Sequence, residues 1–211
     1  MHKSAFIFDM DGVLVDSTPY HLEAWEIALK RYGYNLATDF KVRPYGRRGR
    51  DILGDIAPEM SEEKIDEFAD AAEKIFRDIY ESEVEQIDNV VEFINHLKRR
   101  GYKIALATSA PRENVDMILS VLHLVSFFDP VVCENDVERG KPEPDIYLKV
   151  LEILREKPEN CIVFEDSFAG IESAKRASIE VIGVISTNER EELEKVGIRV
   201  IESFDELLRE L

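Results

Sequence analysis

The chain has 211 residues, of which 45% are hydrophobic and 34% are charged. These values are typical of a globular protein with one large domain, or with a main domain and a small second one. The formal net charge of −17 at pH 7 argues against nucleic acid as a partner, because that binding depends on cationic contacts to phosphates. No apolar run approaches the length of a membrane span and no signal peptide precedes the first predicted strand, so we expect a cytoplasmic protein with no membrane partner.

The first predicted strand is short and entirely apolar. Residues 5–8 read Ala-Phe-Ile-Phe without polar alternation, which indicates a strand buried on both faces, as in a parallel sheet. Asp9 and Asp11 follow directly, at the end of the strand where open parallel sheets bind their ligands, and Gly12 lets the backbone turn away. Two carboxylates at this spacing could bind a hard cation or divide the roles of nucleophile and acid. The alternative is that they are ordinary turn formers or helix caps.

Residues 17–86 show helical patterns and no predicted strand. Apolar residues recur at three- and four-residue spacings over 18–32 and again over 61–83, which predicts two amphipathic helices. Pro19 suits the first turn of the earlier helix, and His21 lies one turn in, on the side expected to face the loop after the first strand. A lone histidine on a helix more often serves packing or lies at the surface. An all-helical segment at this place in the chain predicts an inserted cap domain over 17–86.

The segment between these helices, residues 35–50, is predicted to be irregular and holds a dense basic cluster. Its members are interleaved with glycines, and they are Lys41, Arg43, Arg47, Arg48 and Arg50. Glycines beside arginines form a loop that can approach an anion closely and bind it, so we expect at least one of these arginines to contact substrate. The alternative is a solvated loop whose arginines pair with nearby acidic side chains.

Beyond residue 86, predicted helices and strands alternate. The helices cover 88–100, 111–122, 145–156, 168–177, 188–196 and 203–210, and the strands cover 103–107, 131–133, 161–164, 180–185 and 198–201. This alternation predicts an α/β fold with a doubly wound, parallel-sheet (Rossmann-like) core made of residues 1–16 and 87–211. Cys133 and Cys161 fall at buried strands and are expected to be core residues, with no disulfide framework or zinc site.

Polar side chains follow three of the predicted strands. Besides Asp9 and Asp11, these are Thr108 with Ser109 and Glu165 with Asp166, while Lys141 lies in a loop between prolines and glycine. If the strands are neighbours, all these groups meet in one crevice. Four carboxylates this close together repel one another unless a cation neutralises them, and Mg²⁺, which prefers oxygen ligands, fits best. The hydroxyl and N–H groups of residues 108–110 suit phosphate oxygens, so the set contains the parts that phosphoryl transfer requires.

These motifs resemble the haloacid dehalogenase superfamily, in particular its phosphatase branch with a helical cap. The resemblance covers nearly the whole chain and rests on four motifs: Phe8-Asp9-Met10-Asp11-Gly12, the hydrophobic strand into Thr108, Gly140-Lys141-Pro142 and Glu165-Asp166-Ser167. It implies that Asp9 is the nucleophile and that Asp11 is the acid and base. It also implies that Thr108 and Lys141 bind the phosphoryl group. The Mg²⁺ ligands that it implies are Asp9, Asp11 through its carbonyl, Glu165 and Asp166.

Within that branch, the chain is similar to β-phosphoglucomutases and related sugar-phosphate phosphatases. The segment from Asp16 to His21 looks like the first cap helix of the mutases, and His21 is a candidate for ordering the active-site loop. The mutases' Lys-Gly-x-x-Arg cap motif is not matched in register, because the corresponding stretch reads Tyr45-Gly46-Arg47-Arg48-Gly49. The substrate-binding residues expected from these comparisons and from the strand ends are His21, Gly46, Arg47, Arg50, Ser109 and Ala110.

The prediction is therefore a phosphatase acting on a small phosphorylated metabolite such as a sugar phosphate, as a monomer or weak homodimer. A phosphomutase is the first alternative. A non-enzymatic phosphoacceptor resembling a response-regulator receiver domain is a distant one, because the acceptor aspartate of that class follows a middle strand and its chain has no helical insertion.

Overall fold

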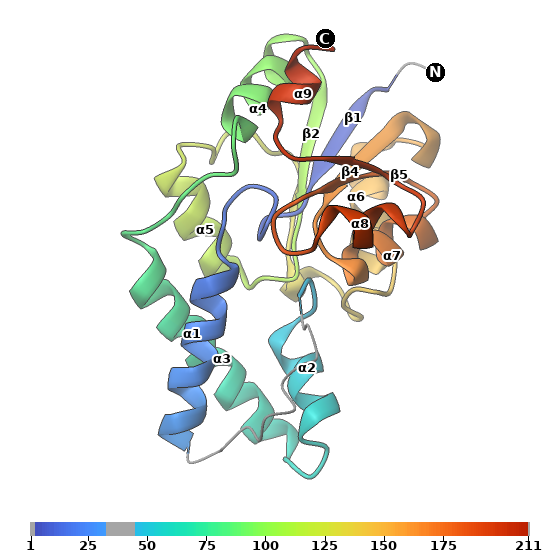
Figure 1. Ribbon diagram of the computed structural model, residues 1–211. Helices are drawn as coiled ribbons and strands as arrows, with labels where there is room; N and C mark the ends of the chain where they lie inside the picture. Colours follow the sequence, from blue (N-terminus) through green and yellow to red (C-terminus); the bar gives the residue numbers. More distant parts are fainter. Residues whose placement is uncertain (1–2, 33–44, 211) are drawn as a thin grey trace.

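The computed structural model describes residues 3–32 and 45–210 of the chain (Figure 1). The expected basic residues Lys41 and Arg43 lie outside the described residues. In the described part, no helix combines the length and the apolar composition needed to cross a membrane.

In residues 3–32 and 45–210, one sheet of six parallel strands forms the centre of the larger lobe. The strand order is β3-β2-β1-β4-β5-β6, and each neighbouring pair is parallel. The strands are β1 (Ala5–Phe8), β2 (Lys103–Ala107), β3 (Val131–Val132), β4 (Cys161–Glu165), β5 (Glu180–Val184) and β6 (Arg199–Ile201). The predicted α/β core is confirmed, and β1 lies between β2 and β4, so the three strands that carry the polar motifs are neighbours.

Helices cover both faces of the sheet because side chains alternate between the faces along each strand. In β1, Phe6 and Phe8 belong to one buried cluster, whereas Ala5 and Ile7 belong to the other. The first cluster is covered by α4 (Val90–Arg99), α5 (Arg112–Val121) and α9 (Asp205–Leu208). The second is covered by α6 (Asp145–Leu154), α7 (Phe168–Arg176) and α8 (Arg190–Glu194). Two short 3₁₀ helices, η1 (Glu134–Asp136) and η2 (Pro158–Asn160), lie in the connections.

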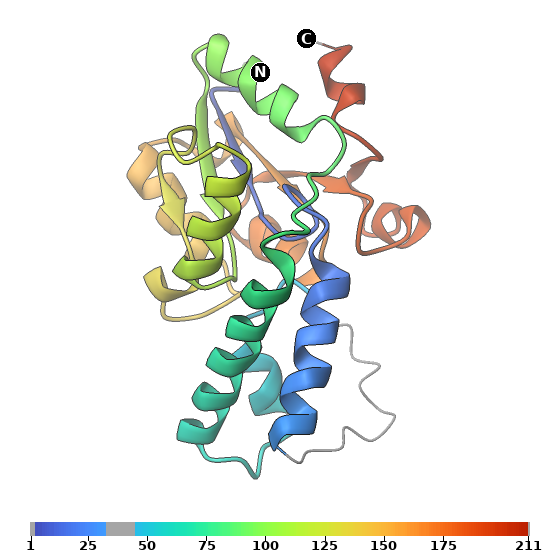
Figure 2. The same cartoon turned by 90° about the vertical axis from the view of Figure 1, so that its left-hand side faces the viewer.

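In the part of the chain that the structure describes, three helices extend beyond the carboxyl ends of the strands, and we call them the cap helices. They are α1 (Thr18–Tyr32), α2 (Gly49–Ile56) and α3 (Glu62–Tyr80). Figures 1 and 2 show α1 and α3 side by side, with α2 next to them. Aromatic residues hold α1 against α3: Trp25 meets Phe68 edge to face at 5.7 Å between ring centres, and Tyr20 lies 4.6 Å from Tyr80.

The prediction of irregular structure up to residue 50 was wrong at its end, because α2 begins at Gly49. Two glycines in eight residues lower the intrinsic helix propensity, which hides this helix in the sequence. Packing compensates: Ile52 and Leu53 are buried in the apolar cluster that the cap helices share. The helix thus owes its stability to tertiary contacts.

The two segments that join the cap helices to the sheet lie beside each other. Val15 forms an antiparallel bridge with Gln86. The amide of Asp16 donates to the carbonyl of Glu85 at 3.0 Å, and the amide of Ile87 donates to the carbonyl of Leu14 at 3.0 Å. These are the positions where the sequence predicts the chain to enter and leave the cap. The division into a core (1–16 and 87–211) and a cap (17–86) stays a prediction.

Candidate active site

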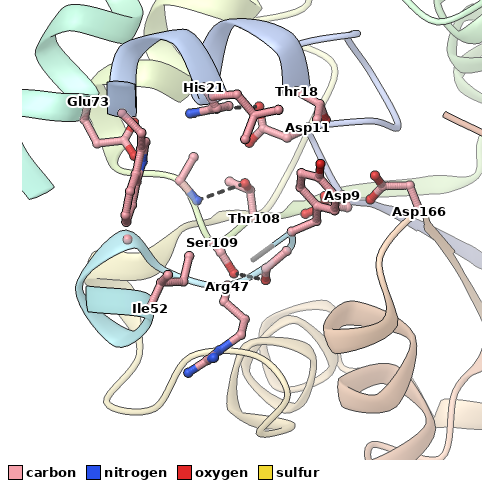
Figure 3. Close-up of a pocket in the computed structure, with 16 residues that line it drawn as sticks. Asp9, Asp11, Thr18, His21, Arg47, Ile52, Glu73, Thr108, Ser109 and Asp166 are labelled. Carbon is pink, nitrogen blue, oxygen red and sulfur yellow. Dashed lines mark hydrogen bonds and ion pairs between the residues drawn. The ribbon is translucent and has the colours of Figure 1, made fainter. Parts of the chain in front are cut away.

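A pocket lies between the carboxyl ends of the central strands and the cap helices (Figure 3). Asp9 and Asp11 line it from the loop after β1, residues 108–110 from the end of β2, and Asp166 from the end of β4. The other side of the pocket comes from α1, α3 and the segment 45–52. The neighbouring positions of β1, β2 and β4 therefore bring together polar groups that are far apart in the sequence.

Lys141 is the cation at the centre of the site and is fully enclosed, with 1% of its surface exposed. Its Nζ donates to Asp9 Oδ1 at 2.7 Å, to Glu165 Oε1 at 2.6 Å and to the carbonyl of Ala107 at 3.1 Å. Three acceptors satisfy all three N–H bonds of the ammonium. Burial by itself lowers the pKa of Lys141, but the charges of Asp9 and Glu165 raise it above its usual value, so the ammonium stays charged.

Glu165 is held by donors on both of its oxygens. Besides Lys141, the hydroxyl of Tyr147 donates to Oε1 at 2.7 Å, and the hydroxyl of Ser167 donates to Oε2 at 3.0 Å. Gly170 makes room for this carboxylate, since a Cβ at that position would lie 1.8 Å from Oε1. Tyr147 is a member of the site that the sequence reasoning missed, because a tyrosine within an apolar helix pattern gives no signal beyond core packing.

The acidic cluster carries more negative charge than Lys141 offsets. Carboxylate oxygens of Asp9, Glu165 and Asp166, one from each, lie within 4.8 Å of one another. Burial raises the pKa of Asp9 well above its usual value, and burial together with Glu165 raises the pKa of Asp166 to about 8. Crowded buried carboxylates with high proton affinity are a favourable site for a divalent cation. Three carboxylate oxygens at this distance could hold a divalent cation such as Mg²⁺, which prefers oxygen ligands.

Asp11 has different surroundings from Asp9. The hydroxyl of Ser17 donates to Asp11 Oδ1 at 2.6 Å, and His21 Nε2 lies 3.3 Å from the same oxygen. Burial favours a higher pKa for Asp11, but the contacts with His21 and Ser17 outweigh it and lower the pKa below its usual value. The His21 ring is fixed by stacking on Phe76, with 3.7 Å between ring centres and 6° between planes. The two carboxylates of the first motif thus have different partners, because Asp9 contacts Lys141 and Asp11 contacts His21.

The end of β2 joins the site to the cap. Thr108 is buried, and its Oγ1 accepts a hydrogen bond from the amide of Ala110 at 3.1 Å. The hydroxyl of Ser109 donates to the carbonyl of Gly46 in the loop before α2 at 2.8 Å. Gly46 has a φ of +79°, and a Cβ there would lie 2.0 Å from Ser167 Oγ. Only glycine fits this close approach of the cap loop to the ends of β2 and β4.

The arginines of the cap segment pair with acidic side chains of the cap helices. Their shortest ion-pair distances are 2.7 Å for Arg47 with Asp55, 2.7 Å for Arg48 with Asp51 and 3.4 Å for Arg50 with Asp66. Arg47 lines the pocket, but Figure 3 shows its guanidinium directed away from Asp9. Arg50 is not among the residues that line the pocket. The structure thus brings His21, Gly46, Arg47, Ser109 and Ala110 to the pocket with Asp9, Asp11 and Thr108, and places Arg50 elsewhere. Lys141 does not line the pocket but contacts Asp9 from within the core.

Two further residues of the pocket region were missed by the sequence reasoning. Glu73 of α3 lines the pocket, and its Oε2 accepts a hydrogen bond from Asn114 Nδ2 of α5 at 2.6 Å. Burial raises the pKa of Glu73, while His21 and Asn114 oppose that rise. The sequence predicts an amphipathic helix over 61–83, and no role in the site was assigned to its acidic residues. The available signal was the position of Glu73 three residues before the buried Phe76, which places both on one side of the helix.

This fold and this site define a class of α/β enzymes whose reactive groups stand at the carboxyl ends of the central strands, beneath a helical insertion. Residues 6–184 match the family model described as haloacid dehalogenase-like hydrolase. The chain belongs to this family.

Named relatives are similar over nearly their whole lengths. A phosphorylated carbohydrates phosphatase of Thermotoga maritima is 36% identical over 98% of this chain and 97% of its own. A hydrolase from Pseudomonas syringae has a similar structure, with a TM-score of 0.89, 26% identity and 99% of each chain covered. A β-phosphoglucomutase from Clostridium difficile gives a TM-score of 0.83 with 26% identity, covering 97% of this chain and 93% of its own.

Proposed function

We propose that this protein is a Mg²⁺-dependent phosphatase that hydrolyses a small phosphorylated carbohydrate through a phosphorylated Asp9. The observation that carries the proposal is the pair of differently placed carboxylates, with Asp9 against Lys141 and Asp11 against His21 and Ser17. The relative from Thermotoga maritima, named a phosphorylated carbohydrates phosphatase, supports the substrate class.

In the first step, an Asp9 carboxylate oxygen attacks the phosphorus, and the bond from phosphorus to the ester oxygen breaks. Lys141 contacts Asp9 Oδ1, which leaves Oδ2 as the attacking atom. Asp11 passes to the departing oxygen a proton that it receives from the His21 imidazolium, whose Nε2 lies 3.3 Å from Asp11 Oδ1, so the leaving group departs as an alcohol. Thr108 and Lys141 stabilise the charge on the phosphoryl oxygens in the transition state.

In the second step, Asp11 takes a proton from a water molecule whose oxygen attacks the phosphorus. The bond between phosphorus and Asp9 then breaks, which restores the Asp9 carboxylate and yields inorganic phosphate. Asp9, Glu165 and Asp166, with the carbonyl of Asp11, would hold Mg²⁺. The bound ion supplies positive charge that lowers the repulsion between the phosphate dianion and the carboxylates.

The cap helices close the other side of the pocket, and we propose that residues 17–86 act as a cap domain that opens for substrate exchange. We propose that the paired segments at Val15 and Gln86 are the hinge. The chain enters the cap at the first segment and leaves it at the second, and the two lie side by side. Closure would exclude bulk water from the site while Asp9 attacks the phosphorus, which strengthens the electrostatic interactions around the phosphoryl group.

A phosphomutase is the second candidate, and the contact between His21 and Asp11 favours it. In the β-phosphoglucomutases that the sequence resembles, the equivalent histidine orders the active-site loop and delays hydrolysis. The cap arginines weigh against this alternative. A mutase must bind a second phosphate of a bisphosphate, whereas Arg47, Arg48 and Arg50 are already paired with Asp55, Asp51 and Asp66.

The two candidates differ in their products. The enzyme is incubated with Mg²⁺, β-glucose 1-phosphate and a trace of glucose 1,6-bisphosphate, and both glucose 6-phosphate and inorganic phosphate are followed. We expect release of phosphate without rapid isomer formation, no turnover by Asp9→Asn, and unchanged turnover by Asp78→Asn on an exposed face of α3. Rapid formation of glucose 6-phosphate without phosphate release would instead establish the mutase.

A further inference from the structure

We propose that Glu73 determines the specificity of this site, by accepting a hydrogen bond from a hydroxyl of the leaving group and by excluding leaving groups that carry a second phosphate. The inference rests on the proposed phosphatase function and deepens it. It names the chemical class that the cap side of the pocket selects, which is a monophosphate whose leaving group is uncharged and carries hydroxyl groups.

Glu73 stands in the part of the pocket where the leaving group would lie. It comes from cap helix α3, whereas the groups assigned to the phosphoryl transfer come from the strand ends on the other side (Figure 3). The Trp25 ring and Glu73 Oε1 both lie next to Gly49. A Cβ added at Gly49 would be 3.4 Å from the Trp25 ring and 3.9 Å from Glu73 Oε1. An aromatic ring beside a carboxylate oxygen suits a sugar, which offers both C–H surface and hydroxyl donors.

The carboxylate is held in place from behind. Asn114, which is fully buried, donates from Nδ2 to Glu73 Oε2 at 2.6 Å. The same amide accepts from Arg77 at 2.6 Å through its Oδ1, so both ends of Asn114 are fixed. No hydrogen bond joins Glu73 Oε1 to another of the residues described in the structure. One oxygen is thus anchored, and the other is an acceptor at the pocket wall, which is the preorganisation that selective binding requires.

The charges on the cap side of the pocket argue against binding of a substrate that carries a second phosphate. Within residues 3–32 and 45–210, the cationic groups on the cap side of the pocket are His21 and Arg47. His21 contacts Asp11, and Arg47 is paired with Asp55 at 2.7 Å. Glu73 is hydrogen-bonded to a neutral amide, and its negative charge is offset in part by His21 and more weakly by Arg77. A phosphate on the far end of a substrate would meet this carboxylate and be repelled.

The test compares Glu73→Gln with the unaltered enzyme on three esters in Mg²⁺: glucose 6-phosphate, glucose 1,6-bisphosphate and p-nitrophenyl phosphate, which has no hydroxyl on its leaving group. Glutamine keeps an oxygen for Asn114 but removes the charge. We expect kcat/KM to fall about tenfold for glucose 6-phosphate and to rise about tenfold for the bisphosphate. We expect it to stay within about twofold for p-nitrophenyl phosphate, which makes no hydroxyl contact.

Two variants control the experiment. Glu63→Gln removes a carboxylate from the exposed side of the same helix and is expected to change none of the three values. Asn114→Ala frees the Glu73 side chain and is expected to weaken the discrimination in the same direction as Glu73→Gln.

The outcomes separate this inference from the function on which it rests. An equal change of kcat/KM for all three esters in Glu73→Gln, or no change at all, would overturn the role of Glu73 while leaving the phosphatase intact. If the unaltered enzyme turned over none of the three esters, the proposed function itself would fail.

Discussion

Lys141 and Tyr147 donate to the same oxygen of Glu165, from a loop and from the helix that follows it. The two distances are 2.6 Å and 2.7 Å, and both side chains are fully buried. The Lys141 ammonium also lies 5.2 Å from the centre of the Tyr147 ring. At this scale the site is a buried network in which each carboxylate depends on a specific donor, because an unpaired buried charge is strongly unfavourable.

Tyr147→Phe tests this network without removing a charge. Loss of the hydroxyl leaves Glu165 Oε1 with Lys141 as its remaining donor, and we expect the free energy of unfolding to fall by about 1–3 kcal/mol. Urea denaturation measures this loss of stability, provided that the dependence of the unfolding free energy on urea concentration is unchanged. The matched control is Tyr102→Phe, since Tyr102 is only half-buried and its hydroxyl has no hydrogen bond within the described part of the chain. Equal stability of the two variants would contradict the account.

The residues of the site differ in how far the sequence could predict them. Asp9, Asp11, Glu165 and Asp166 were proposed because they directly follow apolar strands, where parallel sheets bind their ligands, and Lys141 because its loop matches a motif of the resembled family. Tyr147, Glu73 and Asn114 lie within ordinary helical patterns, and their roles depend on which partner each meets in space. The sequence could not predict those partners, since they come from elements far apart in the chain.

Among the elements, the loop before α2 joins the cap helices to the strand ends. The carbonyl of Gly46 accepts a hydrogen bond from Ser109, and a Cβ at Gly46 would lie 2.0 Å from Ser167 Oγ. The pocket wall on this side is therefore fixed by one glycine in a left-handed conformation, with a φ of +79°.

Gly46→Ala adds a methyl group that would stand 2.0 Å from Ser167 Oγ, so the loop must move away from the ends of β2 and β4. We expect kcat/KM to fall by about tenfold or more, because small displacements in a closed site cost catalysis heavily. Gly54→Ala within α2 is the matched control. A Cβ there meets nothing within 4 Å, and we expect unchanged kcat/KM and about 0.5–1 kcal/mol of added stability. Full activity of Gly46→Ala would show that this contact is not required.

The elements with strong periodicity were predicted well. The helix over 18–32 and the strand over 103–107 have the predicted bounds in the structure. The last two helices are shorter than predicted, because short helices at the edge of a domain depend on packing for their ends. The helix α2 was missed for the same reason, since Ile52 and Leu53 stabilise it only when α3 is present.

At the scale of the whole molecule, a chain with a net charge of −17 is proposed to bind an anionic substrate. The structure resolves part of this contradiction by placing Lys141 at the centre of the strand ends, whereas the cap arginines are paired with their own acidic neighbours and add little positive charge. The remaining negative charge of Asp9, Glu165 and Asp166 is what a bound Mg²⁺ would offset. A substrate phosphate is thus expected to bind together with the metal ion.

The central claim is that Asp9 becomes phosphorylated during turnover, and mass spectrometry after an acid quench tests it most directly. The enzyme is mixed with p-nitrophenyl phosphate and Mg²⁺, quenched within the first turnovers and digested. We predict that the peptide containing Asp9 gains the mass of one phosphoryl group. We expect this species to accumulate further in Asp11→Asn, where water is not activated, and to be absent in Asp9→Asn. Phosphate release without any phosphorylated Asp9 peptide, or turnover by Asp9→Asn, would contradict the account.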